Sequence, residues 1–171
     1  MAEIMGLELK GVKTFIGTDG YGLSANLYLK GKKVASVLDE GNGRGLNVSF
    51  LDNSKKDEIF TIAQKYYKKY PKFILYDNEK WAKLNELIEE LYSLYQTEKY
   101  FKKQVKKDYP IIIEIHYIKR TDNFMKNYSP SKQDCMVAFK EWSDKSKKHL
   151  IEEYQPVEYK VYQKLKDFII E

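Results

Sequence analysis

The sequence predicts an α+β fold, in which an N-terminal four-stranded antiparallel meander is followed by amphipathic helices and one or two further strands. Three observations support this prediction. Glycines are concentrated between Gly11 and Gly45, where turns between short strands need them. From Ser54 onward, apolar residues change from a period of two to a period near 3.6. A β-branched run then begins at Ile111, in the second half of the chain.

The meander is predicted from alternating apolar residues separated by turn residues. Its expected strands are 7–15, 23–29, 34–38 and 46–51. The expected connections are a turn at 17–20, a tight turn at 30–32 and a loop at 39–45. Short connections of this kind are typical of strands that pair antiparallel with their neighbours in sequence.

Two amphipathic helices follow the meander. Ser54 is the expected N-cap of the first helix, with Asp57 completing a capping box, and Pro71 follows its end. Its apolar face is Ile59, Ala63, Tyr66 and Tyr70. The second helix is expected to start near Asp77 or Asn78 and to continue through Phe101 and Val105. Its apolar stripe is Trp81, Leu84, Ile88, Leu91 and Tyr95.

The last third mixes strands and helices. The run 111–119 predicts a strand, and 157–162 predicts a second strand that pairs with it. Between them we expect a third helix from 131 to about 148, with apolar positions Cys135, Met136, Phe139 and Trp142. A final helical turn is expected near Phe168. The organisation is therefore a β-sheet section, 1–53, and a mixed helical section, 54–171, packed together as one compact unit.

Composition restricts the class of protein. Hydrophobic residues make up 43% and charged residues 32% of 171 residues, which is typical of a globular protein. The single cysteine, Cys135, excludes an intrachain disulfide and a cysteine-built zinc site, and favours a reducing compartment. No signal peptide and no apolar run of membrane-spanning length is present. We expect a cytoplasmic protein, without a membrane partner.

The net charge of +5 is unevenly distributed. Residues 1–53 carry six Lys and Arg against six Asp and Glu, whereas residues 54–110 carry thirteen against nine. Residues 111–171 carry eleven against ten. A moderate basic excess supports solubility as readily as it supports binding to nucleic acid.

Two glycine-rich segments do not match phosphate-binding motifs. The loop 41–45 leads from one strand to another and no Lys-Ser/Thr pair follows it, and Gly20-Tyr21-Gly22 lacks the helix that a dinucleotide site needs. Both are interpreted as hairpin turns. Acidic residues of the meander, Asp39 and Glu40 with Asp19 or Asp52, could hold a magnesium ion, but acids are common in turns. No cofactor or metal ligand is assigned.

Catalytic signals are weak. Glu114 and His116 share one face of a predicted strand, which permits an acid–base pair but also fits a solvated strand face. Cys135 would be a nucleophile only if its environment lowered its pKa, and a lone cysteine in helical register is more often a core residue. No catalytic residue is assigned, and an enzyme is not the favoured class.

Two segments combine lysines with aromatic residues and contain no acid. They are 65–72, with Lys65, Lys68, Lys69 and Lys72, and 99–107, with Lys99, Lys102, Lys103, Lys106 and Lys107. Lysines pair with phosphates and exposed tyrosines stack on bases, so these faces are candidate interaction surfaces. The alternative is that the tyrosines point inward and the lysines form a solvated helix face. The loop residues Asp39, Glu40, Asn42 and Arg44 are a second candidate surface.

The segment from Gly11-Val12-Lys13-Thr14-Phe15 through Gly17-Thr18-Asp19-Gly20-Tyr21-Gly22 and Leu27-Tyr28-Leu29-Lys30-Gly31 to Asp39-Glu40-Gly41-Asn42-Gly43 resembles the N-terminal part of small proteins of phages and other mobile elements of low-GC bacteria. The likeness covers about the first fifty residues and carries no active site. It implies a setting in which proteins counteract host defence, CRISPR inhibitors among them.

Three functions follow as hypotheses. The first is a non-enzymatic phage or mobile-element protein that inhibits a host defence complex such as a CRISPR effector, with a host protein or ribonucleoprotein complex as partner, in the host cytoplasm. The second is a nucleic-acid-binding module without sequence preference, because only Arg44 and Arg120 are available for base readout. The third is a small hydrolase or nuclease that uses Glu114, His116 and carboxylates of the loops.

Overall fold

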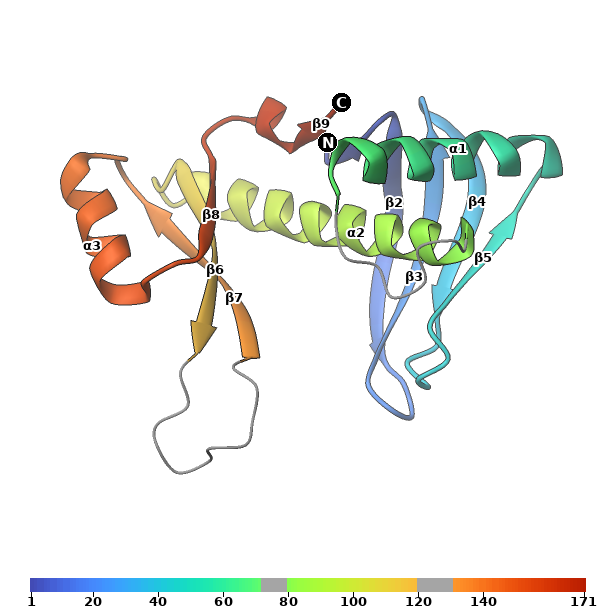
Figure 1. The fold of residues 1–171 in the computed structure, drawn as a ribbon, viewed down its shortest axis with the longest axis horizontal. Coiled ribbons are helices and arrows are strands. Elements are labelled where there is room, and N and C mark those ends of the chain that lie inside the picture. Colours follow the sequence, from blue (N-terminus) through green and yellow to red (C-terminus); the bar gives the residue numbers. More distant parts are fainter. Residues whose placement is uncertain (72–79, 120–130) are drawn as a thin grey trace. The chain divides into compact units, whose positions relative to one another are not determined.

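The N-terminal strands form an antiparallel sheet in the computed structural model, which describes residues 1–71, 80–119 and 131–171 (Figure 1). The predicted α+β fold and its meander are confirmed, because β2 to β5 pair antiparallel in sequence order. The complete sheet has the order β5-β4-β3-β2-β1-β9. Its strands are β1 (Glu3–Ile4), β2 (Leu7–Ile16), β3 (Tyr21–Leu29), β4 (Lys32–Asp39), β5 (Leu46–Phe50) and β9 (Ile169–Ile170).

One face of this sheet is apolar. Register places Leu9 opposite Leu27, Leu27 opposite Ala35, and Val37 opposite Val48, so the same side of each strand carries the apolar residues. The buried members of this face are Leu7, Leu9, Leu23, Ala25, Leu27, Leu29, Ala35, Val37 and Val48. The tight turn expected between β3 and β4 is present, with positive φ at Lys30 and Gly31.

The apolar face is covered by α1 (Asn53–Lys69) and by the first part of α2 (Lys80–Val105) (Figure 1). The α1 residues Ile59, Phe60 and Ala63 are buried. The rings of Phe50, Phe60 and Trp81 contact one another, with centroids 5.0–6.2 Å apart, and so connect β5, α1 and α2. Pro71 follows the C-cap Tyr70, as predicted, whereas the expected start of α2 lies outside the described residues.

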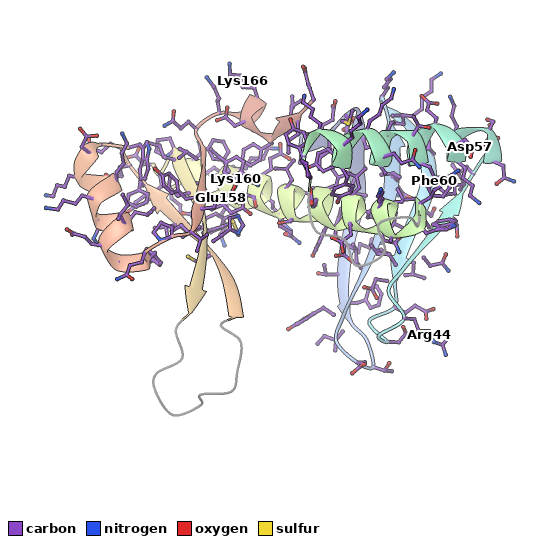
Figure 2. All side chains as sticks on the ribbon, viewed as in Figure 1. Arg44, Asp57, Phe60, Glu158, Lys160 and Lys166 are labelled. Carbon is purple, nitrogen blue, oxygen red and sulfur yellow. The ribbon has the colours of Figure 1, made fainter. Side chains whose placement is uncertain are left out.

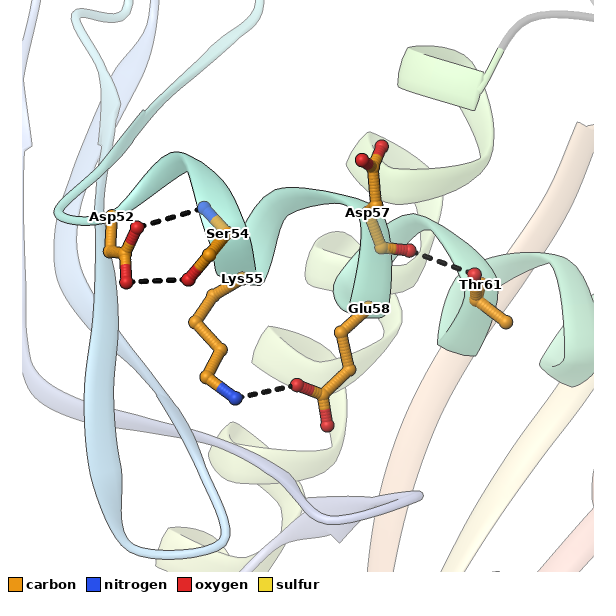
Figure 3. Close-up of polar contacts among 6 residues, drawn as sticks. All are labelled: Asp52, Ser54, Lys55, Asp57, Glu58 and Thr61. Atoms are coloured by element: carbon orange, nitrogen blue, oxygen red, sulfur yellow. Dashed lines mark hydrogen bonds and ion pairs between the residues drawn. The ribbon is translucent and has the colours of Figure 1, made fainter.

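The α1 N-cap is Asp52 rather than the expected Ser54 (Figure 3). The Asp52 carboxylate accepts hydrogen bonds from the Ser54 backbone N–H at 2.8 Å and from the Ser54 hydroxyl at 2.6 Å. These bonds lower the pKa of the Asp52 carboxyl from its ordinary value of 3.8. In place of the expected capping box, the Asp57 backbone carbonyl accepts from the Thr61 hydroxyl at 2.8 Å, and the neighbouring Lys55 pairs with Glu58 at 2.9 Å. Because a carboxylate satisfies free amides at a helix N-terminus, Asp52 replaces Ser54 in this role.

Asp52→Ala is expected to lower the urea midpoint of unfolding, whereas Asp57→Ala leaves it unchanged. The native pKa of Asp52 is lowered, so its stabilisation is present above pH 3.8 and is lost as the pH falls through the native pKa. Asp52→Asn keeps the cap but should lack this acid dependence. Urea titrations at neutral and acidic pH measure both effects. A larger loss from Asp57→Ala than from Asp52→Ala would contradict this assignment.

The second half contains a smaller sheet of order β7-β6-β8, formed by β6 (Ile111–Lys119), β7 (Ser131–Phe139) and β8 (Glu158–Tyr162). The two predicted strands are therefore present, and they pair antiparallel as expected. Helix α3 (Asp144–Tyr154) places Leu150 against Ile113 and Ile115 on one face. On the other face Tyr162 stacks on Phe168, with ring centroids 4.6 Å apart, and Phe168 contacts Phe101 at 5.4 Å.

The third helix expected from residue 131 to about 148 is wrong in its first part. The segment 131–139 is strand β7, which pairs with β6 along its whole length. Helix α3 starts later, after the N-cap Ser143. The apolar residues between 135 and 142 fit either period, but Cys135, Val137 and Phe139 alternate toward the Leu150 cluster, while Met136 is 39% exposed. Pairing with β6 therefore makes the segment 131–139 a strand instead of a helix.

The chain divides into two compact units, and the boundary lies within α2. Unit 1 comprises Met1–Tyr95 and Ile169–Glu171, and unit 2 comprises Gln96–Phe168. The final helical turn is the 3₁₀ helix η1 (Leu165–Phe168), and β9 follows it directly. Strand β9 pairs in parallel with β1, a return to the N-terminal sheet that sequence did not predict. In the described part of the chain, no helix is long and apolar enough to cross a membrane.

Candidate interaction surfaces

The C-terminal end of α2 and the turn that follows it carry a row of lysines, which we call the lysine stripe. Its five members are exposed. Lys99, Lys102 and Lys103 lie on α2, and Lys106 and Lys107 lie in the turn after it. The opposite side of the helix is occupied by buried Thr97, Glu98 and Phe101. Since Phe101 packs on Phe168, the lysines have only the solvent side available. The structure thus brings together all five lysines of this predicted surface.

Most of the lysine stripe is not neutralised by carboxylates. Lys102 pairs with Glu98 at 2.7 Å, and the Glu98 side chain is only 3% exposed. Within the described ranges, no ion pair is recorded for Lys99, Lys103, Lys106 or Lys107. Unit 2 contains sixteen Lys and Arg against eleven Asp and Glu, whereas unit 1 contains fourteen of each. The entire net charge therefore belongs to the unit that carries the stripe.

The lysine–tyrosine segment of α1 is organised differently. Lys65, Lys68 and Lys69 are exposed, but Tyr66 and Tyr67 are buried. Lys69 donates a hydrogen bond to the backbone carbonyl of Glu171. Lys72 lies outside the described residues. Because two of the three tyrosines are internal, this segment provides lysines without the stacking platform that its sequence suggested.

The buried tyrosines of α1 hold a carboxylate of α2. The Tyr66 hydroxyl donates to Glu90 Oε2 at 2.7 Å, and the Tyr67 hydroxyl donates to Glu90 Oε1 at 3.2 Å. Burial first, and then the Glu90 carboxylate, raise the pKa of Tyr66 well above its ordinary value of 10.0. The pKa of Tyr67 is raised for the same reasons. These residues therefore serve to join the two helices within unit 1.

Tyr66→Phe should destabilise the protein by about 2 kcal/mol, because it removes a charge-assisted hydrogen bond from a part-buried site. The raised native pKa means that only the unfolded state ionises this tyrosine just above pH 10.0, so wild-type stability falls there as the pH rises. The free energy of unfolding of the Tyr66→Phe variant should fall less steeply with rising pH than that of the wild type. Urea unfolding at pH 7 and above pH 10 measures both changes. Tyr21→Phe, at a site 82% exposed, is the control and should alter neither.

The loop between β4 and β5 forms the second predicted surface. Asp39 accepts a hydrogen bond from the Gly41 N–H, Glu40 accepts one from the Asn42 side chain, and Asn42 accepts one from the Arg44 N–H. The loop leads from strand to strand, which confirms a hairpin connection. The adjacent turn is fixed to it, because the Asp19 N–H donates to the Gly41 carbonyl at 2.7 Å.

A hollow of about 420 Å³ lies beside this loop. Glu40, Asn42 and Arg44 line it together with Trp81, which is 42% exposed. Arg44 lies at the loop end of the sheet (Figure 2). Asp39 does not line the hollow, since it caps the turn at Gly41. Sequence reasoning assigned Trp81 to the buried stripe of α2, and no periodicity signal could have shown its partial exposure.

The end of the β2–β3 hairpin exposes apolar residues that sequence reasoning did not select. Ile16 and Tyr21 are opposite one another in register and each is 82% exposed. Gly17 is required next to them, because a Cβ at this position would collide with the Glu40 carbonyl oxygen. The alternation of β2 and β3 identifies the face of Ile16 and Tyr21, but only the extent of the covering helices determines their exposure.

The acid–base candidates of β6 have structural partners. Glu114 accepts a hydrogen bond from the Tyr162 hydroxyl at 2.8 Å, and register places His116 opposite Glu158. Both Glu114 and His116 are half-buried, so this strand face is only partly exposed to solvent. The cause is packing of Tyr162 and Phe168 on this side of the sheet. In the same unit, Glu158 and Lys160 of β8 lie near one another (Figure 2).

Cys135 is partly buried and packs against the Leu150 cluster, as expected for a small core residue. Among the described residues, no group of three or more His, Cys, Asp or Glu side chains could hold a metal ion. Comparisons with protein-family models, with curated proteins and with solved structures find no match.

Proposed function

We propose that this chain is a non-enzymatic binding protein of a phage or other mobile element, and that it inhibits a host defence complex such as a CRISPR effector. The observation that carries the proposal is the lysine stripe, a row of exposed lysines at the end of α2 and in the following turn, in the unit that holds the whole net charge. The likeness of the N-terminal segment to mobile-element proteins supplies the setting.

The chemistry of the stripe defines its partner. Lysines are flexible point charges, so they recognise clustered carboxylates or phosphates without demanding one geometry. A defence ribonucleoprotein offers both, as acidic patches of its protein and as the backbone of its guide RNA. A basic blocker would therefore cover such a surface rather than imitate DNA. Steering by the charge of unit 2 would accelerate the encounter at low ionic strength.

Removal of four stripe charges should abolish most of the inhibition. The test variant is Lys99, Lys103, Lys106 and Lys107→Gln, because glutamine removes the charge, stays polar and has a helix propensity similar to that of lysine. Its affinity for a guide-loaded effector should fall about tenfold or more, because several charge contacts are lost together. Surface plasmon resonance with the loaded effector, and target cleavage by that effector, provide the two measurements.

The matched control removes four exposed lysines of unit 1 that lie outside both basic segments, with Lys13, Lys32, Lys33 and Lys80→Gln. It lowers the net charge equally, so any difference between the variants reports position rather than total charge. The control should bind and inhibit like the wild type. Equal inhibition by the stripe variant, or a wild-type protein that leaves every tested defence complex active, would overturn the proposal.

A second candidate function is binding of nucleic acid without sequence preference. It is favoured by Tyr109, which is 37% exposed, follows the stripe in sequence and has the Lys140 ammonium 5.5 Å from its ring centroid. This function predicts similar affinity for free RNA and for a loaded effector. It also predicts a steep loss of affinity between about 50 mM and 200 mM salt, from release of counterions. Preference for the protein complex over free RNA would exclude it.

A further inference from the structure

Strand β5 is an open edge of the N-terminal sheet. It stands first in the strand order and pairs on one side with β4. The Leu51 N–H donates to the Val34 carbonyl of β4. Because backbone groups alternate in direction along a strand, Leu46, Val48 and Phe50 direct their N–H and C=O groups away from β4. Among the described strands, none pairs with these groups.

This edge lacks the features that usually prevent pairing with another chain. Natural edge strands are shortened, charged, bulged or interrupted by proline. The other edge of the sheet, β9, has only two residues. In the smaller sheet, edge strand β8 carries exposed Glu158 and Lys160 and follows Pro156 (Figure 2). Strand β5 has the sequence Leu-Asn-Val-Ser-Phe, without a charge or a proline.

We propose that a second copy of this chain pairs antiparallel with β5, about a two-fold axis at Val48. In this register Val48 meets Val48 of the other copy, Leu46 meets Phe50, and Asn47 meets Ser49. The outward backbone groups of Val48 then bond to those of Val48 in the other copy, and those of Leu46 bond to those of Phe50. The apolar residues share one face and the neutral polar residues share the other, so the strand is complementary to itself.

Residues that flank β5 fit the same register. The axis at Val48 brings Arg44 of each copy toward Asp52 of the other, which joins opposite charges twice. Leu51, which is 62% exposed, and Trp81, which is 42% exposed, lie beside the edge and would be covered. Unit 1 carries fourteen basic and fourteen acidic residues, so two copies of it meet without net repulsion.

The experiment is sedimentation velocity of the full chain over a hundredfold range of concentration. The wild type should sediment as a dimer that dissociates on dilution. Asn47 and Ser49 are exposed on the polar face, so lysines there should leave the monomer folded. Asn47→Lys with Ser49→Lys places lysines opposite one another across the axis, and dimer affinity should fall at least tenfold.

The matched variant tests the register itself. Asn47→Lys with Ser49→Glu alters the same two positions, but it places each lysine opposite a glutamate of the other copy. Its dimer affinity should return to within about threefold of the wild-type value. Circular dichroism and urea midpoints should show both variants folded. Since the readout is mass, the result does not depend on the proposed inhibition.

Three results would overturn the proposal. The first is a wild-type protein that is monomeric at every concentration. If the Asn47→Lys, Ser49→Lys variant of such a monomer lost inhibition, strand β5 would bind a partner protein instead of a second copy. A dimer that tolerates the lysine pair would place the interface elsewhere. A dimer that both variants disrupt equally would contradict the register about Val48.

Discussion

The apolar face of the N-terminal sheet is the constraint on which the structure of unit 1 depends. Leu7, Leu27 and Ala35 are fully buried, and a face of this kind must be covered. Helices α1 and α2 provide that cover, and the contacts among Phe50, Phe60 and Trp81 extend it to the edge strand. What the helices leave uncovered, namely the hairpin end with Ile16 and Tyr21, becomes surface as a consequence.

The same reasoning explains why the lysine stripe is available. A helix that packs on one side and faces water on the other carries its polar residues on the water side. On α2 the packed side is occupied by Phe101 and Glu98. Burial of Glu98 is made acceptable by Lys102, so one stripe lysine has a structural role and the others do not. Packing of unit 2 therefore leaves a basic surface that the neutral unit 1 does not share.

Part of the tyrosine content of the chain has a structural explanation. Tyr66 and Tyr67 donate to Glu90 between two helices, and Tyr162 donates to Glu114 between two strands. In each case an apolar ring fills the interior while its hydroxyl satisfies a carboxylate that would otherwise be costly to bury. Half-buried carboxylates in both units are thus held by tyrosines, and this structural role reduces the number of tyrosines left to contact a partner.

Sequence alone determined the period-two strands of the meander, the turn at Lys30 and Gly31, the end of α1 before Pro71 and the strands β6 and β8. These features are local, because turn chemistry and hydrophobic period act over a few residues. Sequence also grouped the stripe lysines, because they follow one another closely between residues 99 and 107. It could not decide between strand and helix for 131–139, where both periods fit and pairing with β6 selected the strand. Tertiary structure alone placed β9 beside β1, brought Trp81 to the loop hollow and left β5 as an open edge, because each depends on contacts between residues distant in the chain.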